Sequence, residues 1–529
     1  MKKLYLYWNT IRFLKLKQIF YQIYYKFKAP LLPFILYKKY FKNPLYPIVL
    51  NTTVLINSNG KYIRNNTFHF LNLTHSFKND VDWNFEKYGK LWNYNLQYFD
   101  YLHDERIEEI EKQRLIESFS AQLIKKKIPP EAYPVSLRLI NWIIYYSKSG
   151  YTSDNFEKTL KYQIHFLEKN LEYQILANHL LENYFALFVC AYALKNEKLT
   201  QKSFLRIVKE LKEQVLNDGC HYEGSPMYHC IILSKLLLII DIIQQNTWIN
   251  INEEILREKA EKMLAWLNSF CFKKGSYAHF NDSADGIAPE PKILFERGKK
   301  LGLKIENIPL KESGYRKYVS RIYEAIVDIG NILPSYQPGH IHSDIFSFTL
   351  NYKGNPVFVD TGISTYEYSP RRYYERSTIA HNTVVVNDLN QSQVWGSFRV
   401  ARRAKVNISN ENEYSIKAFH DGYFKEFGVI HTRQFFIRSA SFDITDEIVK
   451  KENINSVVVA LFHLDTSVSV TELNGFNVQL SNGLKLCFQN AETVSINDFQ
   501  QACGFNKLIS SKKIVVSFSN QLHTQISIA

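Results

Sequence analysis

The sequence predicts a protein of two large domains, a helical domain followed by an antiparallel β-sandwich. Its 529 residues are too many for a single hydrophobic core. From about Asp80 to Leu303, apolar residues recur at steps of three and four, which is the period of an amphipathic helix. After a connector over residues 304–318 the period changes to two, and no long helical pattern interrupts the runs that follow.

The proposed helical domain covers residues 71–310. Two of its segments carry an apolar stripe on one face, formed by Leu181, Tyr184, Phe185, Phe188 and Ala191 in the first and by Leu236, Leu237, Ile240 and Ile243 in the second. Several helices of this kind can bury their stripes only against one another. The segment therefore predicts a helix-on-helix domain.

The proposed β domain covers residues 311–529 and begins with a hairpin. Phe346, Phe348 and Leu350 alternate with the residues between them, and a Lys-Gly-Asn turn at 353–355 leads into 357–359. Further β-rich runs lie at residues 383–386, 432–437, 456–462, 484–488 and 514–518. An antiparallel sandwich is the economical interpretation.

The remaining segment, residues 1–70, is predicted to be a basic arm. Up to about Tyr46, Lys and Arg mix with apolar residues at roughly helical spacing, so a helix here can lie on a membrane surface or pack on the main body. The sequence leaves both open. Asn9, Thr10 and Arg12 interrupt the apolar start and no small-residue cleavage site follows, so no signal peptide is predicted. We expect a cytoplasmic protein whose arm allows peripheral contact with the inner membrane.

The composition favours an anionic partner. The formal net charge is +14, and aromatic residues make up 15% of the chain, which suits stacking on sugars. The chain has no Arg-rich tail, no zinc-finger cysteine pattern and no nucleotide-binding glycine motif, so nucleic acid ranks lowest. Six cysteines without a CxxC pair indicate buried, reduced thiols. An acidic polysaccharide or a membrane surface remains.

A first polar cluster, Asn178-His179 with Glu182 and Asn183, stands at the start of an amphipathic helix. Spacings of three and four place these side chains on one face. The cluster can be part of a site or an N-terminal cap with ordinary hydrogen bonds, and alone the cap is favoured. The pattern is not HExxH, which excludes a metalloprotease motif.

A second cluster is the loop from His221 to His229, which contains Tyr222, Glu223 and Tyr228 and leads into an apolar helix. A Tyr-His pair after a rigid Gly/Pro turn can present a phenol and an imidazole to a cleft. An ordinary capping loop explains the residues about equally well.

A third cluster, His340-Ile341-His342, comes just before the first strong strand. In an extended segment the two imidazoles point the same way. Asp360 ends the next strand and His381 begins another, and hairpin pairing can bring them together. Two neutral nitrogens and one carboxylate are a zinc-type ligand set.

With these three clusters the sequence resembles the heparinase II/III-like family, which includes heparan-sulfate lyases and oligoalginate lyases. The most specific motif is the series Gly339-His340-Ile341-His342-Ser343-Asp344, Phe358-Val359-Asp360-Thr361-Gly362 and Arg376-Ser377-Thr378-Ile379-Ala380-His381-Asn382-Thr383-Val384. In the helical half, the similar segments are Asn178-His179, Tyr228-His229 and Tyr133-Pro134-Val135-Ser136-Leu137-Arg138 to Asn141-Trp142. The resemblance runs from about Leu91 to beyond Asn387.

The resemblance implies an (α/α) toroid in front of the sandwich and a role for each matching residue. It makes Tyr228 the catalytic acid. The base is either Tyr228 itself or His340, which would lie across the cleft as base or partner. It assigns Asn178 and His179 to the uronate carboxylate. It implies zinc held by His342, Asp360 and His381. Supporting or cleft residues on this reading are Glu182, Tyr222, Glu223, His229, Arg376 and Trp142.

These roles predict a polysaccharide lyase that acts by β-elimination on a uronic-acid-containing glycan. The enzyme removes the C5 proton and breaks the bond from C4 to oxygen, which requires donors that neutralise the adjacent carboxylate. Hydrolysis would need two facing carboxylates, and no such pair stands out. A uronyl C5-epimerase with the same residues is the first alternative, and a non-catalytic glycan-binding protein is the second. Without a predicted export signal, we expect a substrate such as a capsule or lipopolysaccharide chain under construction.

Overall fold

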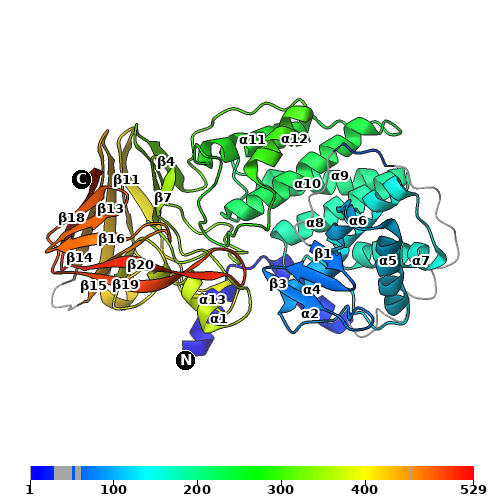
Figure 1. Cartoon of the computed structure of the whole chain (residues 1–529), viewed down its shortest axis with the longest axis horizontal. Coiled ribbons are helices and arrows are strands. Elements are labelled where there is room, and N and C mark those ends of the chain that lie inside the picture. Colours follow the sequence, from blue (N-terminus) through cyan, green and yellow to red (C-terminus); the bar gives the residue numbers. More distant parts are fainter. Residues whose placement is uncertain (1, 29–49, 54–60, 452–455, 529) are drawn as a thin grey trace.

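The computed structural model describes residues 2–28, 50–53, 61–451 and 456–528. Helices fill the N-terminal part and strands the C-terminal part, and the two parts lie side by side (Figure 1). Each part has its own cluster of buried apolar side chains, which agrees with two cores in one chain. The predicted order of a helical domain and then an antiparallel β domain is confirmed.

Two helices and a small sheet precede the helical domain. The helices are α1 (Lys2–Ile11) and α2 (Leu16–Lys28), and the antiparallel sheet has strands β1 (Lys61–Arg64), β2 (Thr67–Phe70) and β3 (Leu73–Ser76). The sheet crosses residue 70, where the sequence analysis ended the arm, and its Phe68 and Phe70 pack into the helical core. The described part of the arm that stands apart from the core is therefore α1 and α2.

The helical domain consists of α-helices joined by short loops, with a 3-10 turn η1 (Asp100–His103) near its start. The helices are α4 (Lys90–Tyr98), α5 (Glu109–Ile124), α6 (Ala132–Ser149), α7 (Asp154–Lys169), α8 (Ala177–Ala193), α9 (Glu197–Gln214), α10 (Pro226–Gln245), α11 (Glu254–Phe270) and α12 (Pro291–Lys300). Among the described helices, α10 alone is long and apolar enough to cross a membrane, and most of it is buried inside the protein. It therefore reads as the core helix of the domain.

The β domain begins with a four-stranded antiparallel sheet, in which the predicted hairpin forms the last two strands. Its strands are β4 (Tyr315–Val319), β5 (Tyr323–Asp328), β6 (Phe348–Tyr352) and β7 (Asn355–Phe358). The long segment between β5 and β6 carries His340 and His342. The short elements after β7 are α13 (Pro370–Arg376), η2 (Thr378–Ala380), β9 (Val394–Trp395), β10 (Arg399–Val400) and α14 (Phe424–Phe427).

Two further antiparallel sheets complete the sandwich. One has the order β19-β20-β15-β8, formed by Thr493–Ala502, Leu508–Ser517, Val458–His463 and Val384–Val386. The other has the order β11-β12-β13-β14-β21-β18-β17-β16, formed by Val406–Asn412, Ser415–His420, Val429–Ile437, Ser441–Lys450, Gln521–Ile528, Leu484–Gln489, Asn477–Leu480 and Val470–Asn474. Burial alternates along β13 and β21, so that Val429 and Phe435 of the first strand and Leu522 and Ile526 of the second point inward.

Candidate active site

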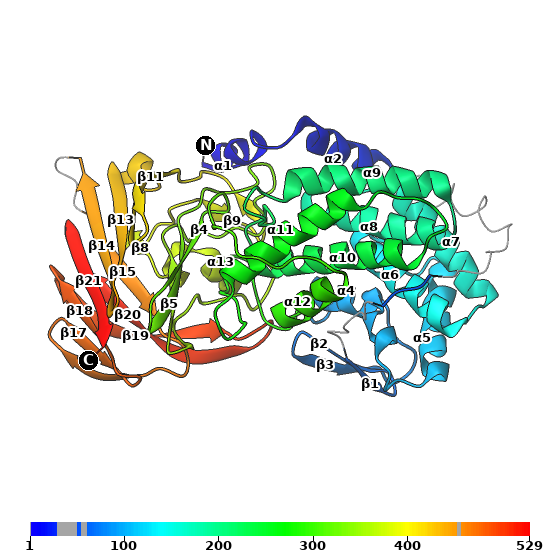
Figure 2. The same cartoon turned by 90° about the horizontal axis from the view of Figure 1, so that it is seen from above.

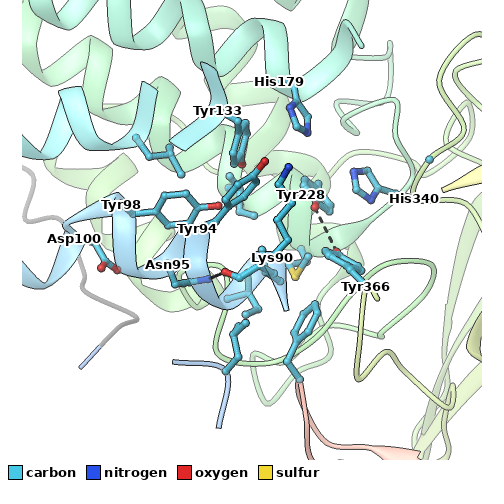
Figure 3. A pocket seen from close by; sticks show the side chains of 18 of the residues that line it. Lys90, Tyr94, Asn95, Tyr98, Asp100, Tyr133, His179, Tyr228, His340 and Tyr366 are labelled. Atoms are coloured by element: carbon cyan, nitrogen blue, oxygen red, sulfur yellow. Dashed lines mark hydrogen bonds between the residues drawn. The ribbon is translucent and has the colours of Figure 1, made fainter. Parts of the chain in front are cut away.

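A cleft of about 740 Å³ lies between the helical domain and the β domain. Its walls come from α4, α6, α8 and α10 on one side and from the segments around residues 337–340, 366–368 and 397–398 on the other. Figure 3 shows the side chains that project into it, among which tyrosines are prominent. Sites between two domains commonly bind extended ligands because both surfaces contribute contacts.

Tyr228 enters this cleft from the first turn of α10. The Ser225 hydroxyl caps the helix by accepting a hydrogen bond from the Tyr228 N–H at 3.2 Å, and Pro226 occupies the first helical position. The preceding Gly224 has φ +67°, and a Cβ there would lie 3.1 Å from Ile341 of the β domain. The loop thus needs glycine to bring Tyr228 close to the β domain.

His340 stacks on the Tyr228 ring, with ring centroids 3.8 Å apart and planes at 27°. The Tyr228 hydroxyl also lies 3.3 Å from the hydroxyl of Tyr366 (Figure 3). Burial raises the pKa of the Tyr228 phenol, and the hydrogen bond with Tyr366 opposes this effect only in part. Tyr228 therefore holds its proton at neutral pH and is a proton donor in the resting protein.

His179 lines the cleft from the first turn of α8. Its Nδ1 donates to Glu172 Oε1 at 2.9 Å, and its ring lies 4.4 Å from that of Tyr133. Burial works against the charged imidazole, but Glu172 outweighs it and raises the pKa of His179. Leu176, which caps the helix, and Ala177, its first residue, have positive φ values of 68° and 52°, which residues other than glycine rarely adopt. This strained turn sets the direction in which α8 begins.

Asn178 lies just behind the cleft wall and links its two sides. Its Nδ2 donates to Glu223 Oε2 at 2.7 Å and lies 3.4 Å from His340 Nε2. Its Oδ1 is buried and has no hydrogen-bond partner among the residues that the structure describes.

Asp282 joins the two domains beneath the cleft. Its carboxylate accepts hydrogen bonds from His340 Nδ1 and His342 Nε2, each at 2.9 Å, and a bidentate pair from Arg372 at 2.5 and 2.7 Å. Although burial disfavours the charge, Arg372 and the two histidines hold the pKa of Asp282 well below its usual range. Because His340 uses Nδ1 for this bond, its Nε2 faces the cleft.

The imidazoles of His340 and His342 do point to the same side of the segment, as predicted, but both of them donate hydrogen bonds to Asp282. His342 Nδ1 and His381 Nε2 are both buried and have no hydrogen-bond partner in the described part of the chain. The centroids of the two rings lie 5.4 Å apart. Burial lowers the pKa of His342 to about 4, so Nδ1 carries a lone pair. Asp360 Oδ2 instead accepts from His381 Nδ1 at 2.6 Å. Within the described ranges no group of three or more His, Cys, Asp or Glu is close enough to hold a metal.

The structure corrects several predicted cleft residues. Trp142 is fully buried and packs against Phe99, Phe119 and Phe156, so it is a core residue. Arg376 is fully buried and donates to the Ile341 carbonyl, and therefore supports the HxH segment from behind.

The other four corrected residues are also buried and absent from the cleft lining: Glu182, Tyr222, Glu223 and His229. His229 contacts Trp266 and the Met263 carbonyl, and Tyr222 bonds to Tyr336, so both hold the loop around Tyr228. Glu223 reaches the site only through Asn178. These residues shape the site without touching the cleft.

Five residues of the site were not predicted from the sequence: Asp282, Arg372, Tyr366, Glu172 and Lys90. Lys90 and Tyr366 line the cleft, while the other three position the residues that do. Asp282 lies in a loop between α11 and α12 with no periodic pattern, and its partners come from a distant part of the chain. Only a Tyr-rich stretch around residues 366–368 gave a signal, typical of a sugar-binding wall.

Both domains match models of one protein family. Residues 145–290 match the family model for the heparinase II/III N-terminus, and residues 306–529 match the heparinase II/III-like C-terminal model. The chain belongs to the heparinase II/III-like family. The predicted resemblance is thereby confirmed.

Individual members of the heparinase II/III-like family are distant from this chain. A heparin-sulfate lyase of Bacteroides stercoris is 24% identical over 324 residues, 56% of this chain and 47% of that protein, so the match spans about half of the relative's length. A heparinase III structure aligns with a TM-score of 0.66 at 17% identity, covering 86% of this chain and 80% of that one. A heparan sulfate lyase from Pedobacter heparinus gives 0.55 at 16%, covering 88% and 81%. These structures show the fold, a helical toroid followed by a β-sandwich.

Glu182 provides a test of the site's buried charge. Burial raises the pKa of its carboxyl to about 7 from an ordinary 4.5, so the folded state binds more protons than the unfolded state between these values. The free energy of unfolding must then fall as the pH rises through this window, by about 3 kcal/mol in total. Glu182→Gln should remove this loss, so it should stabilise the protein more at about pH 8 than at about pH 5 in chemical denaturation.

The matched control is Glu86→Gln, which changes an exposed carboxyl in the same domain. Its stability should follow that of the wild type at both pH values. An equal effect of the Glu182 substitution at both pH values would show that the buried carboxyl does not take up a proton on folding.

Proposed function

We propose that the protein is a polysaccharide lyase that cleaves a uronic-acid-containing glycan by β-elimination. The observation that carries this proposal is the stacked pair of Tyr228 and His340, which lines a cleft of about 740 Å³ together with His179. The names of its relatives, heparin-sulfate and heparan sulfate lyases, support an acidic glycan as substrate. Lys90, Lys235 and His179 add positive charge to the cleft walls.

Binding of the uronate carboxylate falls to His179 and Asn178 in this proposal. Glu172 favours the protonated imidazole of His179, which can neutralise the carboxylate next to C5. The Asn178 amide, whose Nδ2 lies 3.4 Å from His340 Nε2, can complete the hydrogen bonds. Removing charge from the carboxylate makes the C5 proton more acidic, since the carbanion-like intermediate places its negative charge there.

The proton steps then divide between the two rings that stack. His340 Nε2 takes the proton from C5, and the electron pair of that C–H bond forms the double bond between C4 and C5. The bond from C4 to the glycosidic oxygen breaks, and this oxygen receives the proton of the Tyr228 hydroxyl. Burial keeps that proton on Tyr228 in the resting protein, which suits a general acid.

Asp282 acts through His340. A buried carboxylate that accepts from Nδ1 fixes the tautomer with a free Nε2 and stabilises the imidazolium that forms when the C5 proton arrives. Arg372 holds the carboxylate with two hydrogen bonds, so its position does not depend on His340 alone. Asp282 is therefore a positioning residue.

A zinc ion near this centre is part of the proposal. The buried, unpartnered His342 Nδ1 and His381 Nε2 fit a metal, and Asp360 is bonded to His381 in the manner of a carboxylate that orients a ligand. When bound, zinc would brace the β-domain segment that carries His340. The unpartnered nitrogens of His342 and His381 support these two residues as zinc ligands. Asp360 would become a third ligand only if its hydrogen bond with His381 were broken.

We also propose that the glycan is a surface polysaccharide under construction, such as a capsule or lipopolysaccharide chain, met at the inner membrane. The basic N-terminal arm supports this setting. Cell fractionation tests it, since activity found wholly in the periplasmic or secreted fraction would contradict it.

Substitution of Tyr228 by Phe should abolish most of the lyase activity. Loss of the acid should lower kcat by roughly 100-fold or more on a cleaved uronic-acid polymer. Absorbance of the unsaturated product, measured across a panel of such polymers, gives the rate. Tyr94→Phe is the matched control, because Tyr94 lines the same cleft while its hydroxyl is bonded to Glu131.

The same assay in deuterated solvent separates the alternatives. Deuterium at C5 without unsaturated ends would identify an epimerase, and neither signal across a broad panel would favour a binding protein. Equal rates for the wild type and the Tyr228→Phe protein would remove Tyr228 from the mechanism.

Asp282→Asn should lower kcat by roughly 100-fold with little change in KM, because the substrate does not touch this residue. If Asp282 acts through His340, the double variant Asp282→Asn/His340→Ala should be no slower than His340→Ala alone. A further large loss in the double variant would mean that Asp282 has a role of its own. Thermal unfolding of each variant shows whether the interdomain contact survives.

Metal analysis tests the zinc assignment. We expect about one zinc ion per chain of wild-type protein, its loss in His342→Ala, and a lower thermal midpoint in that variant or after chelation. His523→Ala, which changes a histidine on β21, should keep the metal. A wild-type protein purified without zinc and unable to bind added zinc would contradict the assignment.

A further inference from the structure

Helices α1 and α2 bury one polar side chain each and leave their large apolar side chains exposed. In an ordinary surface helix the apolar stripe faces the core. Here Asn9 and Gln18 are almost fully buried, with 2% and 1% of their surface exposed. The large apolar residues face outward, with 46–85% of their surface exposed: Leu4, Trp8 and Ile11 in α1, and Leu16, Phe20, Ile23 and Phe27 in α2. Their spacing of three and four makes one continuous stripe per helix.

This orientation is fixed by specific contacts with both domains. On α1, the Trp395 indole N–H donates to the Thr10 hydroxyl at 3.1 Å, and Arg403 lies 3.8 Å above the ring of Phe13, just after this helix. On α2, the Gln18 amide donates to the Ile175 carbonyl of the helical domain at 3.2 Å and to the Tyr336 carbonyl of the β domain at 3.3 Å. Figure 2 shows the two helices lying in succession along one edge of the molecule, α1 near the β domain and α2 beside α9. The outward stripe is thus a consequence of how the helices dock.

Nearly all of the net positive charge of the chain lies in residues 1–79, the segment that contains α1 and α2. Thirteen of its 65 Lys and Arg residues come before Asp80, and none of its 51 Asp and Glu residues do. The remaining 450 residues, with 52 basic and 51 acidic side chains, carry a net charge of only +1. Arg12, Lys15, Lys17 and Lys26 are exposed beside the apolar stripes. A partner of this face must therefore accept apolar side chains and attract positive charge.

We propose that α1 and α2 form a surface that binds an anionic lipid bilayer, with both helices lying in the membrane plane. Apolar and aromatic side chains flanked by Lys and Arg are the composition of interfacial helices. Helices of 10 and 13 residues are too short to cross a bilayer, which needs about 20. A second copy of this chain offers little complementary charge, since its other residues are nearly neutral overall.

The geometry suits shallow insertion. The stripe residues reach into the boundary between headgroups and acyl chains, and the basic side chains remain among the anionic headgroups. Trp8 suits the membrane–water interface because its ring combines an apolar body with a polar N–H. Each Lys or Arg near such a surface adds about 1 kcal/mol of attraction, which salt weakens.

Vesicle binding of the full-length protein tests the proposal. We expect binding to vesicles that contain phosphatidylglycerol, weaker binding at high salt, and little binding to pure phosphatidylcholine. The triple variant Leu16→Ser/Phe20→Ser/Phe27→Ser should lower the partition coefficient at least roughly tenfold, because it removes apolar area that enters the lipid. Arg12→Gln/Lys26→Gln should lower it too and reduce the dependence on salt.

The matched control is Ile408→Ser/Val449→Ser/Leu473→Ser, which removes three exposed apolar residues from the β domain and should leave binding unchanged. None of the substituted residues lines the cleft, so activity on a soluble glycan should be equal in all these proteins and failure of one property does not imply failure of the other. The proposal is overturned if the wild type ignores anionic vesicles or if the triple variant binds as well. It is also overturned if light scattering shows a wild-type dimer that the triple variant loses while no protein binds vesicles.

Discussion

The buried carboxylate of Asp282 is the interaction on which the candidate site depends. It belongs to the helical domain, yet its partners His340, His342 and Arg372 all belong to the β part of the chain. A charge at this depth is stable only while those partners surround it, since an unpaired buried carboxylate is costly by several kcal/mol. The contact therefore ties the position of His340 to the docking of the two domains. Tyr228, on the helical side, then finds its stacking partner in place.

A second consequence is that the two halves of the site have different chemical characters. The helical side contributes groups that hold protons, because Tyr228 is buried and Glu172 favours the protonated form of His179. The β side contributes His340, whose Nδ1 is already committed to the carboxylate of Asp282 and whose Nε2 is left to accept a proton. Proton-holding groups and this acceptor thus line the same cleft. This polarity is what an elimination with one acid and one base requires.

The sequence was informative wherever a local period or motif determined the structure. The change of period near residue 318 marked the change from helices to strands, and the HxH spacing placed His340 and His342 on one side because backbone alternation is local. Roles that depend on rotation about a helix axis were harder. Asn141 lines the cleft whereas Trp142, one residue later on α6, points into the core, because successive helical residues differ by about 100°. Asp282 could not be found at all, since its partners are set by tertiary packing.

The divided site also bears on how such proteins can be recombined. A chimera that takes its β domain from one relative and its toroid from another would pair an Arg372 equivalent with a foreign loop. The short stretch Asn281-Asp282-Ser283 contacts the loop of Tyr228 on one side and the HxH segment on the other. The unit of exchange is thus not the domain as drawn by secondary structure. It is the β domain together with this three-residue loop. The loop lies among the helices in the sequence, but its Asp282 is bonded to residues of the β domain.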